Sequence, residues 1–202
     1  MKRAGLVLVF VFALMIGTAC KPKTIEQAME RDVPFQVNKL IKQIQLEGNK
    51  RLVFYTLNAE VNYGDIGRKI DDILNAAIFK GNPEEGWEFL GAKGWNHYTD
   101  DDMEVYDSTI HYQENQETKD IAVMFGRIHN PDIATVDVGN EETGYIQANL
   151  FEADGIRYFY RVYSLDDLRW EHKGTPREGE AVSIGAKGFH AKGISKDGEV
   201  LK

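Results

Sequence analysis

Apolar runs of strand length, each bounded by turn residues, recur through most of this chain. Residues 52–57, 121–128 and 133–138 are such runs, rich in β-branched, aromatic and aliphatic side chains. Asn130-Pro131-Asp132 separates the last two runs, and proline presets the φ angle that a turn needs. We therefore expect residues 133–138 to form a strand that returns from residues 121–128.

The dipeptide Asp154-Gly155 is the strongest hairpin signal in the chain, because both residues suit the backbone of a two-residue turn. With two turn residues, the predicted register pairs Ala153 with Ile156, Glu152 with Arg157, Phe151 with Tyr158, and Leu150 with Phe159. Each pair is chemically sensible, which supports the register. Residues 196–199 predict a second turn, between a strand at 189–194 and a short last strand at 200–201.

One short helix is predicted near the amino end. Thr24-Ile25-Glu26-Gln27 fits a capping box, in which the Thr24 hydroxyl accepts from the amide of Gln27 and the Gln27 side chain reaches back. The helix runs from residue 25 to about residue 31, and Pro34 ends it. A strand is expected somewhere between residues 38 and 46.

Residues 66–78 carry the one extended helical spacing. Their apolar members lie on one face of a 3.6-residue period: Ile66, Ile70, Ile73, Leu74, Ala77 and Ile78. This spacing favours a helix. The alternative is a short strand at residues 76–79 that enters a hairpin at Gly81-Asn82-Pro83.

Closely spaced turns and little helical periodicity predict an α+β protein that is mostly β. We expect an antiparallel β-sandwich or curled sheet, with one or two short helices near the N-terminal half. The acidic stretch at residues 98–107 is expected to be a connecting loop and a possible subdivision of the domain.

The amino end is an uncharged apolar segment, residues 4–16, that follows Lys2 and Arg3. It is short for a membrane-spanning helix, which needs about 20 residues. The small residues 17–19 then lead to Cys20, the only cysteine. This arrangement resembles a bacterial lipoprotein signal peptide, although Gly17 stands where that family usually has a branched aliphatic residue. An ordinary secretory peptide with an incidental cysteine is the alternative.

The resemblance implies export, removal of residues 1–19 and attachment of lipid to Cys20. Residues 20–34 would then be a lipid-anchored tether with the short helix, and residues 35–202 a β-rich extracytoplasmic domain. Removal of Lys2 and Arg3 leaves 22 of the 24 basic residues against 32 acidic ones, a formal charge of −10. Such a surface repels nucleic acid and anionic headgroups, so we expect no nucleic-acid partner and membrane contact through the lipid alone. With Cys20 lipidated, no disulfide can form.

Motifs for the common chemistries are not found in the sequence. It has no phosphate-binding glycine loop, zinc-type cysteine pattern, His-Glu-x-x-His helix or Gly-x-Ser-x-Gly elbow. The five histidines lack metal-binding spacing. Asp100-Asp101-Asp102 lacks the alternation and the glycine of a calcium loop, which favours a solvated loop. We therefore expect no cofactor, no metal and no catalytic residues.

A Gly-Trp step occurs twice, at Gly86-Trp87 and Gly94-Trp95, and His97 and Tyr98 follow. Exposed tryptophans stack on ligands, and the glycines would let a ligand or another backbone approach. Trp87, Trp95, His97 and Tyr98 are therefore candidate ligand-binding residues. Packing of the tryptophans in a sheet core is the alternative.

The mature part resembles small lipoproteins of Bacillus-like Gram-positive bacteria whose function is unassigned. The resemblance is carried by residues 24–28, Gly86-Trp87, residues 125–132, residues 157–160 and residues 196–199. It implies a β-rich module anchored at the extracytoplasmic face of the cell membrane. A non-catalytic binding or interaction module is expected, with an envelope polymer, small ligand or membrane protein as partner. A cell-envelope hydrolase that uses carboxylate acid and base groups is the alternative.

Overall fold

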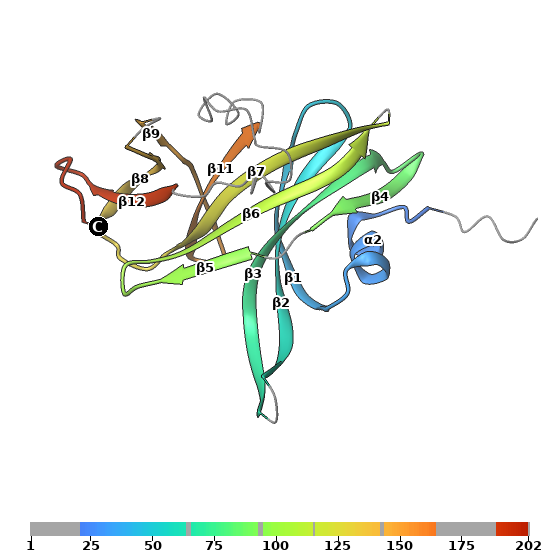
Figure 1. Ribbon diagram of the computed structural model, residues 1–202, viewed down its shortest axis with the longest axis horizontal. Coiled ribbons are helices and arrows are strands. Elements are labelled where there is room, and N and C mark those ends of the chain that lie inside the picture. The colour runs from blue at the N-terminus through green and yellow to red at the C-terminus, as the bar shows by residue number, and fades with distance from the viewer. Residues whose placement is uncertain are drawn as a thin grey trace, which may run out of the picture.

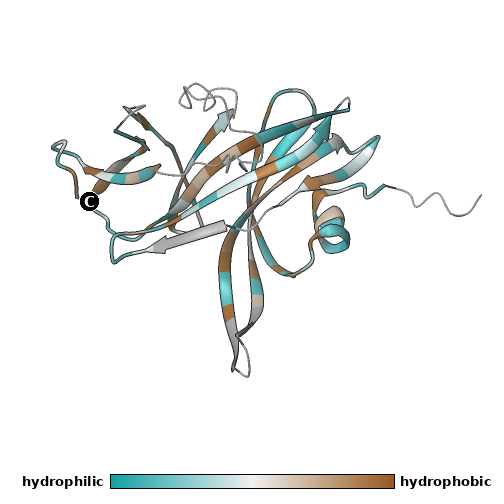
Figure 2. Cartoon of the chain, viewed as in Figure 1, coloured by the Kyte–Doolittle hydropathy of each residue, from teal (hydrophilic) through white to brown (hydrophobic). Residues whose placement is uncertain are grey.

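The computed structural model describes residues 21–201 except 64–65, 93–94, 115, 142–143 and 165–188. This part of the chain has one helix and twelve strands, and the strands form three antiparallel sheets (Figure 1). The protein is therefore mostly β with a short helix near its N-terminal half, as the sequence predicts. Apolar positions, brown in Figure 2, recur along the strands.

Helix α2 (Ile25–Asp32) confirms the predicted helix and its cap. The Thr24 side chain accepts a hydrogen bond of 3.2 Å from the amide of Gln27. In a capping box the Gln27 side chain would accept from the amide of Thr24. Here its Oε1 accepts instead from the amide of Lys23, one residue earlier, at 3.0 Å. Ile25, Ala28 and Met29 form the buried face of the helix.

The first sheet, sheet A, has the strand order β1-β2-β3-β4. Its strands are β1 (Gln36–Gln45), β2 (Lys50–Tyr63), β3 (Ile66–Asn82) and β4 (Gly86–Gly91). The helix favoured for residues 66–78 is wrong, because these residues belong to β3. Residues 73–79 are buried without a break, so both faces of this strand are covered. A strand buried on both faces has continuous apolar residues, and their spacing can imitate a helix.

The second sheet, sheet B, has the order β10-β11-β7-β6-β5. Its strands are β5 (Trp95–Thr99), β6 (Met103–Glu114), β7 (Glu117–Ile128), β10 (Asn149–Ala153) and β11 (Ile156–Ser164). The hairpin of β10 and β11 has the four residue pairs that the sequence predicts. Asp154 and Gly155 have φ angles of 52° and 75°, as a two-residue turn of this kind requires.

The acidic stretch at residues 98–107 is part of sheet B and not a connecting loop. It spans the end of β5, a tight turn and the start of β6. The Asp100 carboxylate accepts from the amides of Asp102 and Met103 at 2.8 and 2.7 Å. This aspartate therefore forms the turn itself.

The third sheet, sheet C, has the order β12-β8-β9 and contains β8 (Ile133–Asn140), β9 (Gly144–Gln147) and β12 (His190–Ser195). The turn predicted before Ile133 is present, with the Asp132 amide bonded to the Asn130 side chain at 2.8 Å. However, β8 does not pair with β7, because β6 and β11 occupy both edges of that strand. The predicted turn at residues 196–199 is also present, and it leads from β12 to a bridge between Ile194 and Val200.

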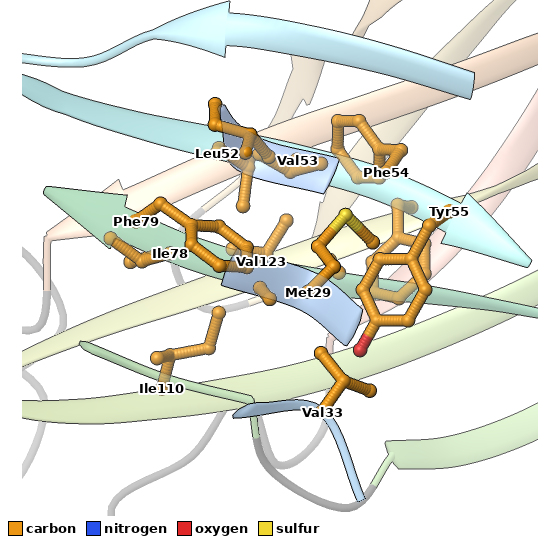
Figure 3. Packing of buried hydrophobic residues seen from close by; sticks show 14 of the residues in the cluster. Met29, Val33, Leu52, Val53, Phe54, Tyr55, Ile78, Phe79, Ile110 and Val123 are labelled. Atoms are coloured by element: carbon orange, nitrogen blue, oxygen red, sulfur yellow. The ribbon is translucent and has the colours of Figure 1, made fainter. Parts of the chain in front are cut away.

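Two apolar clusters make sheet B the middle layer. The larger cluster joins sheet A, α2 and one face of sheet B, and the ring centroids of Phe54 and Phe125 lie 5.5 Å apart within it. Figure 3 shows Met29, Tyr55 and Val123 in this cluster. The smaller cluster packs Met124 and Phe159, from the other face of sheet B, with Val136 of β8.

Candidate functional site

The predicted site residues lie on two different sheets. Cys20 is outside the described residues. Trp87 lies in β4, whereas Trp95, His97 and Tyr98 lie in β5, an edge strand of sheet B, and their side chains are also outside the described set. Trp87 is 3% exposed, and the Arg51 guanidinium lies 4.9 Å from the centre of its ring. The position of Trp87 therefore favours the core-packing interpretation for this tryptophan.

The first described residues, 21–24, are bound to the turn between β3 and β4. The amide of Trp87 donates a hydrogen bond of 2.7 Å to the carbonyl oxygen of Pro22. The Lys21 ammonium lies 3.0 Å from the Glu88 carboxylate, and the Lys23 ammonium donates to the carbonyl oxygen of Glu84 at 2.7 Å. We call residues 21–24 the N-terminal clasp.

Gly86 makes the clasp possible. Its φ angle is +84°, in the region that favours glycine. A Cβ atom at this position would lie 2.5 Å from the Cβ of Lys21 and 3.0 Å from the carbonyl oxygen of Pro22. The sequence suggests that this glycine lets either a ligand or another backbone approach. In the structure, the backbone of residues 21–22 approaches Gly86.

The turn under the clasp has its own cap. The Asn82 side-chain oxygen accepts from the amides of Glu84 and Glu85, both at 2.9 Å, and the Asn82 amide group donates to the Glu85 carboxylate. These bonds hold the Glu84 carbonyl, which Lys23 contacts, in a defined place. The clasp therefore rests on an ordered turn.

A second polar cluster surrounds Arg127 on β7. The side chain of Arg127 is 12% exposed, and its Nη1 donates to Glu104 of β6 at 3.0 Å. Its Nη2 contacts both the carbonyl oxygen of Asp72, at 2.8 Å, and the Asp72 carboxylate, at 3.1 Å. This arginine consequently joins sheet B to strand β3 of sheet A.

Asp72 reaches Arg127 from a bulge in sheet A. The register of β2 and β3 shifts between Leu57 and Ala59, and Asp72 has a φ angle of 60° there. Asn58 stabilises the bulge, since its side-chain oxygen accepts from the Asp72 amide at 3.1 Å and from Asn38 of β1 at 2.6 Å. Because of the bulge, both the backbone carbonyl and the carboxylate of Asp72 lie within hydrogen-bond distance of the Arg127 guanidinium.

Two tyrosines complete the Arg127 cluster. Burial raises the pKa of the Tyr106 phenol, and the bond with Glu104 acts in the same direction. Burial also raises the pKa of Tyr158, although the Arg127 charge opposes this shift. Both phenols are therefore neutral at ordinary pH. Because two carboxylates of the same chain compensate the arginine, the cluster can hold two sheets together but offers no uncompensated charge to an anion.

A third cluster lies where β6 and β2 meet β3. Lys50 and Lys80 contact the Glu114 carboxylate at 3.0 and 3.2 Å, and these hydrogen bonds lower the pKa of Glu114. The Lys50 ammonium also lies 5.7 Å from the centre of the Tyr112 ring. A hydrogen bond with Lys119 lowers the pKa of Glu117 in the same way, and hydrogen bonds with Lys192 and Tyr145 lower the pKa of Glu141.

Sequence reasoning did not identify the Arg127 cluster or the contact of Pro22 with Trp87. Arg127 and Glu104 lie 23 residues apart, and Arg127 and Asp72 lie 55 residues apart. Within the described residues, no group of three histidine, cysteine, aspartate or glutamate side chains is placed to hold a metal ion. The described residues also include no helix long and apolar enough to cross a membrane.

Comparison of the chain with protein-family models, curated proteins and solved structures finds no match.

Proposed function

We propose that this protein is a lipoprotein of the cell envelope, held at the extracytoplasmic face of the cell membrane by lipid on Cys20. The observation that carries the proposal is the position of the only cysteine, directly after residues 4–16 and three small residues. Two or more acyl chains, at about 0.8 kcal/mol per buried methylene, give stable anchoring where one chain does not.

The β-rich domain is proposed to be a non-catalytic binding or interaction module. The charged clusters support this assignment, since Arg127 and Glu114 are each compensated by partners from neighbouring strands. Such groups stabilise a rigid scaffold. An envelope polymer, a small ligand or a membrane protein is the proposed partner class, and the acidic composition disfavours nucleic acid.

Lipidation is tested by comparing the full chain with its Cys20→Ala variant in a bacterial host that processes lipoproteins. We expect the unaltered chain to incorporate a palmitate analogue and to sediment with membranes. The variant should incorporate none and should leave the membrane fraction. An unlabelled, soluble wild-type chain would overturn the proposal.

The binding role is tested by cross-linking in intact cells, followed by pull-down of the full chain from membranes. A specific envelope partner that is retained after mild cross-linking is the expected result. A further outcome is that the Cys20→Ala variant loses the partner in cells while the purified variant still binds that partner in solution. In that case the lipid anchor contributes only by raising the local concentration of the domain near its partner. If no partner is captured and the purified protein cleaves envelope polymer, the domain is an enzyme and the binding role is wrong.

A further inference from the structure

We infer that the α2–β4 end of the domain lies directly against the lipid headgroups, because the chain that leads from Cys20 is packed onto this end. This inference rests on the proposed lipid attachment. The sequence-based expectation for residues 20–34 is a tether with a short helix, and the inference adds that residues 21–24 are held against β4 and the β3–β4 turn.

The distance from the anchor to the domain is set by covalent geometry. Pro22 is hydrogen-bonded to Trp87 at 2.7 Å, and Cys20 precedes Pro22 by two residues. Two residues of fully extended chain span at most about 7 Å. A flexible tether of the same length as residues 20–34 would instead have a root-mean-square span of roughly 20 Å. The clasp therefore keeps the attachment point close to the start of β4.

Three separate contacts fix the clasp, so rotation about a single bond does not release it. The Pro22 carbonyl, the Lys21 ammonium and the Lys23 ammonium each have a partner on the β3–β4 turn or on β4. The clasp then continues without a break into α2, whose Ile25 is buried in the main core. The position of Lys21, which directly follows Cys20 in the chain, is thus determined by the fold.

The charges at this end do not attract an anionic membrane. Lys21 is paired with Glu88, and Glu84 and Glu85 are exposed on the adjacent turn. The net charge of the mature chain is negative as well. Contact between this end and the headgroups consequently depends on the covalent lipid, and the domain without lipid should not bind vesicles.

The elements at the end opposite α2 and β4 would lie farthest from the membrane. Figure 1 shows α2 and β4 at one end of the long axis, and sheet C with β8, β9 and β12 at the opposite end. Two large apolar side chains are exposed at this distal end: Ile146 of β9 and Val200 beside β12. With its α2–β4 end against the headgroups, the domain would expose sheet C to the other components of the envelope.

The test uses the only cysteine as a chemical handle. The mature chain, residues 20–202, is coupled through the Cys20 thiol to a maleimide-bearing phospholipid in phosphatidylcholine vesicles. A fluorescent non-natural amino acid is placed at Glu84, beside the clasp, or at Asp197, on the turn after β12. Nitroxide groups on the lipid headgroups then quench fluorescence at short range.

We expect the probe at Glu84 to be quenched several-fold more strongly than the probe at Asp197. Insertion of ten glycine and serine residues between Cys20 and Lys21 is the matched control. That linker spans roughly 17 Å on average, and it should bring the two probes towards equal, weak quenching. Equal quenching without the linker, or stronger quenching at Asp197, would overturn the inference.

The same probes are then measured in lipoprotein purified from bacterial membranes. If cells do not lipidate Cys20 but the coupled chain behaves as expected, the proposed function fails and the geometry of the clasp stands. If cells do lipidate Cys20 and the probes are quenched equally, the proposed function stands and the orientation is wrong.

Discussion

The backbone amide of Trp87 and the carbonyl oxygen of Pro22 are joined by a 2.7 Å hydrogen bond across 65 residues of sequence. Trp87 is the first buried side chain of β4 to pack in the core, and Pro22 lies two residues after the proposed lipid site. This one bond links the packing of sheet A to the point where the protein would leave the membrane.

Removal of Lys21 and Pro22 should expose the Trp87 amide. A hydrogen bond of this kind contributes about 1 kcal/mol to the free energy of unfolding, and a buried donor left without a partner costs more. We expect faster hydrogen exchange at Trp87 and a loss of about 1–2 kcal/mol in denaturant unfolding. Lys21→Ala is the control, because it removes only an exposed ion pair worth about 0–1 kcal/mol. Unchanged exchange in the deletion variant would contradict the observed clasp.

Gly86→Ala should destabilise the protein more than Gly48→Ala. Both glycines have positive φ angles, of 84° and 69°, so both substitutions carry a backbone cost of about 1 kcal/mol. At Gly86 the new Cβ also meets Lys21 and Pro22, whereas no atom lies within 4 Å of a Cβ at Gly48. The two free energies of unfolding are measured with denaturant. Deletion of Lys21 and Pro22 should remove the excess cost at Gly86, as a double-mutant cycle would show.

Arg127→Leu should destabilise the domain by about 2–4 kcal/mol. The substitution leaves Glu104, whose side chain is 16% exposed, without its guanidinium partner. Glu104→Gln in the same chain should recover part of this loss, because it removes the carboxylate charge that the Arg127 guanidinium balances. Asp72→Asn is the matched control. Asparagine tolerates the φ angle of 60°, and the Asp72 carboxylate is largely exposed, so we expect a change of less than about 1 kcal/mol. Equal effects of the Arg127 and Asp72 substitutions on unfolding would show that Glu104 is not the main partner.

Glu114 should contribute to the acid sensitivity of the fold. Lys50 and Lys80 lower its pKa below the ordinary value of 4.5, so the folded state binds its proton less tightly than the unfolded state does. The resulting stabilisation is complete above about pH 5 and is lost as the pH falls through the lowered pKa. Glu114→Gln should therefore flatten the dependence of unfolding free energy on pH between about 5 and 3.

Glu117→Gln provides the comparison for that experiment. The pKa of Glu117 is lowered by Lys119, but its side chain is largely exposed, and solvent and salt screen the pair. We expect this variant to keep the acid dependence of the unaltered protein. An identical flattening in both variants would mean that the two lysines around Glu114 add no stability of their own.

Features that depend on a few adjacent residues could be predicted from the sequence. The cap on Thr24 follows from a hydroxyl three residues before an amide. The register of β10 and β11 follows from a two-residue turn and the period of two along each strand. The proposed role of Cys20 also comes from the sequence, because an apolar run and its flanking residues are a linear pattern.

Other features were decided by residues that meet only after folding. The spacing of residues 66–78 suits a helix, but pairing with β2 and burial of both faces make them a strand. The partner of β8 depends on the fact that β6 and β11 already occupy both edges of β7. The contacts of Arg127 with Asp72, and of Pro22 with Trp87, join segments that are 55 and 65 residues apart. By itself, therefore, the sequence determined the helix cap, the turns and the predicted lipid site, because local backbone preference is encoded by neighbouring residues. The tertiary structure alone decided how strands pair outside the β10–β11 hairpin and where residues 21–24 attach to the domain, because those choices depend on surfaces that no short segment contains.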